Sequence, residues 1–293
     1  MNQLVAPLIP AYHLSLEEIH STLEKVPKHF EIPLIVYNDQ DVLTYEYLKS
    51  LEEEGEIRLV HIPFQVGKAE AVRRGLKSLL RQSDANIIVQ LDGRSKQPVE
   101  STKDLVDTLI SGDNHMVIGN RYKLQNMEGQ LHRASSSILL SSIVEGMTGY
   151  KIQDTVCGMR AYVRHLAEKF CNLKSFGYGL EIEEILISHS HGSRIGELPI
   201  QSNRQDDKTN AEKIEDNFHV LISCAGDKNV EDDAISLLNH ILLQVKKRIS
   251  FDFSLSAFKT DKIFMFEYIR GEDPIIEGYT NQKIIDAYRI LSH

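Results

Sequence analysis

Small and polar residues follow several apolar runs of this sequence, at positions where the strands of a sheet would end. They are Pro10, Ala11, Tyr12, Asn38, Asp39, Gly67, Lys68, Asp92 and Arg121. Backbone groups and short polar side chains at the carboxyl ends of parallel strands are the usual means of holding a base and a ribose. A Gly-Lys pair at a strand-to-helix turn suits a phosphate or a ribose, because a helix N-terminus presents unpaired N–H groups. These residue types together indicate a nucleotide site.

The elements that must position these residues alternate between strand-like and helix-like runs over the first two-thirds of the chain. We expect strands at residues 4–9, 34–37, 57–62, 87–91, 116–118 and 193–200. We expect helices at residues 16–26, 42–53, 69–81, 101–111, 133–149, 181–189, 232–247 and 281–291, with a polar loop at 201–215. Ser101 and Asp104 have the spacing of a capping box. The alternation predicts an α/β fold with a mostly parallel sheet flanked by helices.

Composition excludes several classes of protein. The 293 residues are 42% hydrophobic and 26% charged, which permits an ordinary buried core. The net charge of -9 argues against nucleic-acid binding. Three cysteines without CxxC spacing fit a reducing compartment, and neither a signal peptide nor an apolar run of about 20 residues is present. We therefore expect a soluble, cytoplasmic protein without a transmembrane segment.

The strand-end blocks resemble, in order, those of family 2 glycosyltransferases. IPAYH (9–13) is similar to their IPAYN, VYND (36–39) to VVDDGS, VGKAEAVRRGL (66–76) to GKGxAxRxG, IIVQLDG (87–93) to the strand that carries DxD, and VIGNRY (117–122) to VIGSRY. DTVCGMRAY (154–162), Phe176-x4-Glu181-x-Glu183 and IGELPI (195–200) look most like the branch of dolichol-phosphate mannose synthase and the bacterial polyprenyl-phosphate glycosyltransferases. The resemblance covers residues 4–208 and implies the GT-A fold.

The resemblance also implies a domain plan and an activity. A GT-A domain would span residues 1–228, and an α-rich extension at 229–293 would cover the acceptor side, form a homodimer or complete the fold. The activity implied is transfer of a hexose, with inversion, from a UDP- or GDP-sugar to a polyprenyl phosphate or a soluble acceptor. The donor-binding residues implied are Pro10, Ala11, Tyr12, Asn38, Asp39, Gly67, Lys68, Asp92, Arg94 and Lys96.

The residues that bind the acceptor in the family pattern are largely present in this sequence. The groups implied for binding an acceptor phosphate are Arg121, Arg133, Ser137, Arg204 and Lys208. Arg133 and Ser137 are four residues apart, so they share one face of the expected helix. The catalytic residues implied are Asp154 and Asp92. A phosphate acceptor is already ionised and needs little help from a base, whereas a sugar hydroxyl would need one, and Asp154 is the best candidate.

The metal site departs from the family pattern. Asp92 is the first acid of DxD, but Arg94 stands at the second, and Lys96 occupies a further position that often helps to bind metal. Mg²⁺ and Mn²⁺ require oxygen ligands, so the only metal ligand that the resemblance leaves is Asp92. One hypothesis is that Arg94 and Lys96 neutralise the diphosphate, which would make the enzyme independent of metal.

Two other hypotheses about the function stay open. A catalytically inactive GT-A-like protein with a binding or regulatory role is also consistent with the change in DxD. A sugar nucleotidyltransferase would carry a Gly-rich phosphate loop after the first strand, and IPAYHLSLEE contains no glycine there. Tyr37 and Asn38 replace the two acids of VVDDGS, so the donor base stays open as well.

Overall fold

The computed structural model describes residues 3–12, 14–91, 98–121, 140–141, 144–145, 147–175, 177, 179–201, 220, 253–254 and 267–268. The chain divides into two compact units. One comprises Met1–Gln125 and Cys157–Gln205, and the other comprises Asn126–Val156 and Asp206–His293. The first unit contains the sheet on which the predicted strand ends lie.

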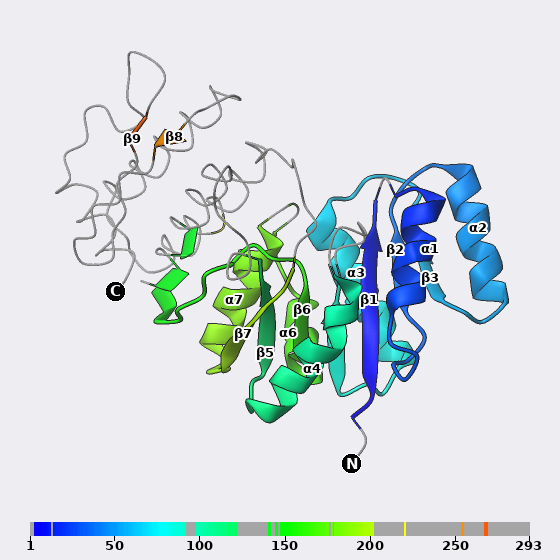
Figure 1. Ribbon diagram of the computed structural model, residues 1–293. Helices are drawn as coiled ribbons and strands as arrows, with labels where there is room; N and C mark the ends of the chain where they lie inside the picture. Colours follow the sequence, from blue (N-terminus) through cyan, green and yellow to red (C-terminus); the bar gives the residue numbers. More distant parts are fainter. Residues whose placement is uncertain are drawn as a thin grey trace. The chain divides into compact units, whose positions relative to one another are not determined.

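Seven strands of the first unit form one sheet (Figure 1). They are β1 (Val5–Ala11), β2 (Leu34–Tyr37), β3 (Arg58–His61), β4 (Ile87–Gln90), β5 (Met116–Asn120), β6 (Arg160–Val163) and β7 (Ile195–Pro199). Their order is β3-β2-β1-β4-β6-β5-β7, and β6 runs antiparallel to both of its neighbours while the other pairs are parallel. The carboxyl ends of the parallel strands therefore meet at one edge.

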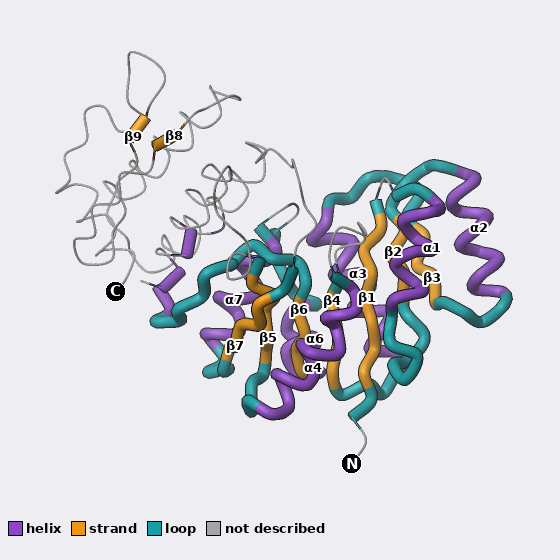
Figure 2. The backbone as a smooth tube through the Cα atoms, viewed as in Figure 1, coloured by secondary structure: helices purple, strands orange, loops and turns teal. Residues whose placement is uncertain are grey.

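Helices cover this sheet in two rows (Figure 2). The helical elements are α1 (Leu16–Lys25), α2 (Val42–Glu53), α3 (Lys68–Gln82), η1 (Val99–Ser101), α4 (Thr102–Ser111), α6 (Arg164–Phe170) and α7 (Leu180–Ser190). Helix α3 contacts α6, which contacts α7, while α1 and α4 both contact η1. Every residue of β2, β4 and β5 is buried. Continuous burial of this kind means that both faces of the sheet are covered.

Gly75 explains how α3 lies so close to the sheet. A Cβ atom at this position would come within 2.5 Å of Leu8 Cδ1 and 2.6 Å of Val36 Cγ2. These distances are far inside van der Waals contact, so only glycine lets the helix approach β1 and β2 this closely. Gly75, the last glycine of the GKGxAxRxG-like block, thus sets the position of the helix whose first turn carries Lys68.

Most of the predicted elements are confirmed. The strand at 34–37 and the helix at 42–53 have the predicted bounds, and the others within the described residues differ by at most two residues at either end. The expected helices at 133–149, 232–247 and 281–291 and the loop at 201–215 lie wholly or mostly outside the described residues. Strand β6 and helix α6 were not predicted.

The predicted capping box at Ser101 is wrong. Ser101 has helical backbone angles and caps nothing with its side chain, because the 3-10 turn η1 leads directly into α4. The structure instead has a capping box at Ser15, at the start of α1. Ser15 Oγ accepts from the Glu18 N–H at 3.2 Å, and Glu18 Oε2 accepts from the Ser15 N–H at 3.0 Å. Glu reaches back to the cap more easily than the shorter Asp does.

Candidate functional site

The ends of β1 and β2 form one side of the candidate site. Ala11 and Tyr37 are register partners, and the Asn38 N–H donates to the Ala11 carbonyl at 3.1 Å. Asn38 is 3% exposed, whereas Asp39 beside it is half-buried. The two strand ends are therefore tied together, with Tyr12 and Asp39 following directly on them. This places five of the predicted donor-binding residues, Pro10, Ala11, Tyr12, Asn38 and Asp39, at neighbouring strand ends.

An aromatic stack supports the loop that follows β2. The His61 ring lies between those of Tyr37 and Tyr45, at centroid distances of 5.7 Å and 4.1 Å. The Tyr37 hydroxyl donates to the Asp41 carbonyl at 3.1 Å, and His61 Nε2 lies 3.3 Å from the Asp39 carbonyl. Burial, and secondarily the charge of Asp39, raises the pKa of Tyr37, so its hydroxyl keeps the proton that it donates. The stack fixes the path of residues 38–41.

His61 and Tyr45 were not predicted as part of this site. His61 ends β3 directly opposite Tyr37, and Tyr45 lies in the first turn of α2. The available signal was an aromatic or imidazole ring at the end of each of two adjacent strands. Asp41 caps α2 by accepting the Thr44 N–H at 2.9 Å, and hydrogen bonding from the Thr44 side chain, together with this N–H, lowers the pKa of Asp41. The carboxylate thus stays ionised at the start of the helix.

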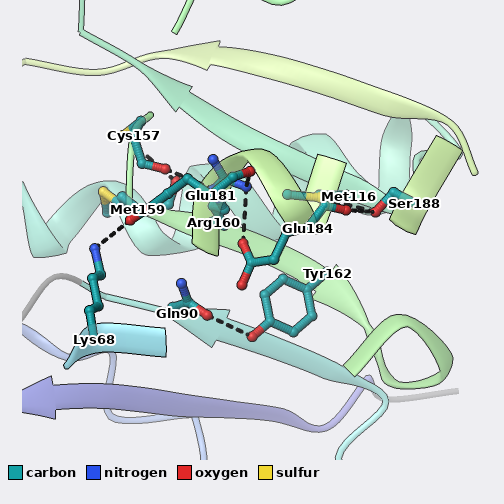
Figure 3. A network of polar contacts seen from close by, with 10 residues as sticks. All are labelled: Lys68, Gln90, Met116, Cys157, Met159, Arg160, Tyr162, Glu181, Glu184 and Ser188. Atoms are coloured by element: carbon teal, nitrogen blue, oxygen red, sulfur yellow. Dashed lines mark hydrogen bonds and ion pairs between the residues drawn. The ribbon is translucent and has the colours of Figure 1, made fainter. Parts of the chain in front are cut away.

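The Gly67–Lys68 turn lies at the start of α3. Gly67 has a φ of +77° and occupies the N-cap of α3, where it has no side chain to cap the helix. Glycine adopts this left-handed conformation without the steric cost that a Cβ would bring. Lys68 Nζ lies 2.5 Å from Glu181 Oε1 on α7, and the two side chains are 15% and 5% exposed (Figure 3). The predicted donor-binding lysine is therefore anchored by a carboxylate from the other end of the domain's sequence.

A buried charge cluster lies behind this ion pair. Arg160 on β6 is fully buried; its Nη1 donates to the Glu181 carbonyl at 2.8 Å and to Glu184 Oε2 at 3.0 Å, and its Nε donates to the Cys157 carbonyl at 2.7 Å. Burial raises the pKa of Glu184 to about 7, against the opposing effect of Arg160. Arg160 therefore holds the main chain of Glu181 while Lys68 holds its side chain.

The cluster continues to the middle of the sheet. The Tyr162 hydroxyl donates to Gln90 Oε1 at 3.0 Å, and burial raises the pKa of Tyr162 well above its usual value. Figure 3 shows the Glu184 carboxylate between Arg160 and the Tyr162 ring. Among the described residues, Glu184 Oε1 and Gln90 Nε2 have no hydrogen-bond partner. Each of these two buried polar atoms therefore carries a desolvation cost.

The other predicted residues are placed as follows. Arg121 is half-buried directly after β5, where the fully buried Asn120 donates its Nδ2–H to Glu197 Oε1 at 3.2 Å. Asp154 is fully buried and belongs to the second compact unit. The remaining predicted residues, Asp92, Arg94, Lys96, Arg133, Ser137, Arg204 and Lys208, lie outside the described residues.

No group of three or more His, Cys, Asp or Glu side chains within the described residues is arranged to hold a metal ion. No helix within them has both the length and the apolar character needed to cross a bilayer.

The strand order of the seven-stranded sheet, with β6 antiparallel to its neighbours, defines an α/β domain of the GT-A class, and solved structures agree. The glucosyl-3-phosphoglycerate synthase of Mycobacterium tuberculosis, solved with Mn²⁺, UDP and glucosyl-3-phosphoglycerate, superposes with a TM-score of 0.56 at 17% identity, over 78% of this chain and 81% of that one. A mycobacterial protein superposes with a TM-score of 0.57 at 16% identity, over 91% and 84% of the two chains. At these identities the likeness shows the fold alone.

The sequence narrows the class to a family. The profile of glycosyl transferase family 2 matches residues 8–171, and the chain belongs to this family. Similar proteins are the undecaprenyl-phosphate 4-deoxy-4-formamido-L-arabinose transferases of Photorhabdus laumondii (25% identical over 171 residues, 56% of this chain and 50% of the relative) and Klebsiella pneumoniae (23% over 230 residues, 75% and 67%). The chain matches about half the length of the Photorhabdus protein. The predicted family and fold are confirmed.

Proposed function

We propose that the carboxyl edge of β1, β2 and β4 binds a nucleoside-diphosphate sugar. The observation that carries this proposal is that strand pairing on a GT-A sheet brings Ala11, Tyr12, Asn38 and Asp39 together. Backbone groups at such an edge hold a base and a ribose, and the carboxyl ends of strands are the usual ligand position in α/β sheets. Gly67 and Lys68 contribute the N-terminal end of α3, and a helix N-terminus suits the ribose or a phosphate because its dipole favours negative charge.

The reaction that we propose is transfer of a hexose with inversion. An acceptor oxygen attacks the anomeric carbon, forming a new C–O bond as the bond to the β-phosphate oxygen breaks, and the electron pair leaves with the nucleoside diphosphate. A phosphate acceptor attacks as an anion, whereas a hydroxyl acceptor passes its proton to a base, for which we propose Asp154. The names of the similar undecaprenyl-phosphate transferases support a polyprenyl phosphate as acceptor, and a soluble phosphorylated or hydroxylated molecule is the alternative.

We further propose that fixed cations replace a metal ion at the diphosphate. The DxD position supplies Asp92 but then Arg94 and Lys96, so the chemistry of this donor set does not fit Mg²⁺ or Mn²⁺. Arg and Lys instead bind phosphate oxygens directly, and guanidinium does so with two parallel hydrogen bonds. Charge on the leaving diphosphate would then be stabilised by side chains that remain in place throughout the reaction.

Nucleotide binding is the first test. UDP and GDP, each in EDTA, are titrated into the protein in a calorimeter and in a thermal unfolding assay, because a ligand at about 100 times its Kd stabilises the native state by about 2.7 kcal/mol. We expect one of the two to bind, and Asp39→Asn to weaken that binding about tenfold. Asp107→Asn, on the exposed surface of α4, is the matched control and should bind as the wild type does. Absence of binding by both nucleotides, with and without Mn²⁺, would overturn the proposal.

A second candidate function is nucleotide-sugar binding without transfer. The observation in its favour is Arg94 at the second acid of DxD. Release of free hexose or transfer to an acceptor distinguishes the two functions, because a binding protein would leave the donor intact while still showing the calorimetric signal.

A further inference from the structure

The segment that joins α6 to α7 is held from two sides by buried charges. Arg73 on α3 donates through Nη1 to the carbonyl of Leu173 and, at 2.9 Å, to that of Ser175. Glu183 on α7 accepts the N–H groups of Lys174 and Ser175, at 2.6 Å and 2.8 Å. Each charged side chain therefore satisfies two backbone groups, and hydrogen bonds of this kind are stronger than neutral ones.

Both charged groups are built into the protein interior. Arg73 and Glu183 are each 8% exposed. Glu70 fixes Arg73 by accepting its Nε–H at 2.8 Å and its Nη2–H at 2.5 Å, and also accepts Arg74 Nε–H at 2.8 Å. Burial of the Glu70 carboxylate opposes its ionisation, but the hydrogen bonds from Arg74 and Arg73 outweigh this and lower its pKa. Anchored in this way, Arg73 keeps its Nη1 directed at the carbonyls of Leu173 and Ser175.

These contacts bear on the candidate donor site through Glu181. The segment at 173–175 leads into α7, and Glu181 in the first turn of α7 is the carboxylate that anchors Lys68. Helix α3 thus makes two charged contacts with this region: Lys68 at its first residue and Arg73 one and a half turns later. Glu183, which accepts the N–H groups of Lys174 and Ser175, lies two residues after Glu181 on the same helix, so the segment is tied to the turn of α7 that carries the partner of Lys68.

We propose that Arg73 and Glu183 are positioning residues for the donor site. They hold residues 173–175 so that Glu181 reaches Lys68 and keeps the Gly67–Lys68 turn in its nucleotide-binding arrangement. Neither residue touches the substrate. The effect on catalysis rests on the proposed transferase function, whereas the effect on the first turn of α7 does not.

Arg164 supplies a control for Arg73. It is a half-buried arginine that likewise donates to carbonyls, with Nη1 at 2.8 Å from the Ser83 carbonyl and Nη2 at 2.8 Å from the Leu80 carbonyl, but it holds the far end of α3. Arg73→Met and Arg164→Met each remove an arginine that satisfies backbone carbonyls. A purely structural role predicts similar results for the two variants.

The experiment compares both variants by amide hydrogen exchange and by steady-state kinetics. We expect Arg73→Met to speed exchange about tenfold in residues 180–183 and to raise the donor KM about tenfold, with kcat changed by less than about twofold. Arg164→Met should leave both unchanged, and Arg73→Lys should recover part of each effect. Equal exchange at residues 180–183 in Arg73→Met and the wild type would overturn the inference, whatever the activity. Altered exchange with an unchanged donor KM would overturn the link to the donor site. A wild type without nucleotide binding would instead overturn the proposed function.

Discussion

Helix α3 contacts two regions of the first unit: an apolar region on β1 and β2, and a charged region formed by residues 173–175, the start of α7 and the Arg160–Glu184 pair. Toward β1 and β2 it packs through Gly75 against aliphatic side chains, with no room for a further carbon atom. Toward α7 it is held by charges, Lys68 with Glu181 and Arg73 with residues 173–175, next to the fully buried pair Arg160–Glu184. The first region is sensitive to added volume and the second to a lost partner. Close packing fixes the distance of the helix from the sheet, and directional charged contacts fix what lies beside its first turn.

The largest effect should follow removal of a partner from the charged region. Arg160→Met leaves Glu184 buried without its cation and removes two further hydrogen bonds to carbonyls. Breaking one side of a buried pair typically costs about 3–5 kcal/mol, which we expect as the loss in free energy of unfolding measured with urea above the pKa of about 7 at which folded Glu184 ionises. The double variant Arg160→Met with Glu184→Met should lose less than Arg160→Met alone. A double variant less stable than the single one would show that the unpaired carboxylate is not the source of the loss.

The same region should give the protein a dependence of stability on pH. Because the pKa of Glu184 is raised to about 7 in the folded state, folded Glu184 keeps its proton as pH rises from the usual glutamate range, while unfolded Glu184 loses it. Its contribution to stability is full below about pH 4.5 and is lost as pH rises to about 7, by about 3 kcal/mol, since one pKa unit is worth about 1.4 kcal/mol. Urea unfolding at several pH values should show this fall in the wild type relative to Glu184→Gln. Parallel pH profiles would contradict it.

A smaller loss should follow added volume in the apolar region. Gly75→Val places side-chain atoms where Leu8 and Val36 already lie, and overpacking of this kind costs about 1–3 kcal/mol. Lys77→Val introduces the same residue on the exposed side of the same helix and controls for helix propensity. If both variants lose the same stability, the close approach of α3 to the sheet is not what Gly75 provides.

The smallest effect should come from a charge pair outside both regions. Lys103 and Asp107 form an ion pair on α4 with side chains 56% and 57% exposed. Exposed pairs of this type contribute little to stability, so Lys103→Met should leave the free energy of unfolding unchanged within the error of a urea titration. A loss comparable with that of Arg160→Met would remove the distinction between buried and surface charges on which the comparison depends.

The strands and helices around the apolar region were predictable from the sequence, because the strands are short β-rich runs and the helices carry a 3.6-residue period. Residues 34–37 and 42–53 show this most plainly, since their predicted and observed bounds coincide. The identification of Ala11, Asn38 and Asp39 as neighbours follows from the same pattern, since parallel strands end at one edge.

The charged region was not predictable in the same way. Strand β6 is the one strand of the seven-stranded sheet that runs antiparallel to its neighbours, and it begins at the fully buried Arg160, so a charged residue stands where the apolar pattern of a strand would start. Glu181, the partner of Lys68, lies 113 residues away along the chain, and Ser175, whose carbonyl accepts from Arg73, lies 102 residues away. Local periodicity carries no information about such pairs. His61 and Tyr45 were missed for the related reason that ring stacking between β3 and α2 depends on their packing in space.

We propose that this chain transfers a hexose and that fixed cations, rather than a metal ion, neutralise the diphosphate. The direct measurement is transfer of labelled hexose from UDP-glucose or GDP-mannose to a polyprenyl phosphate, in EDTA and with added Mn²⁺, for the wild type and for Arg94→Gln with Lys96→Gln. We predict equal wild-type rates in the two conditions and a loss of at least about 100-fold in the double variant, as expected when charge stabilisation at the leaving group is removed. Transfer that occurs only with Mn²⁺, or full activity of the double variant, would contradict the proposal that Arg94 and Lys96 neutralise the diphosphate.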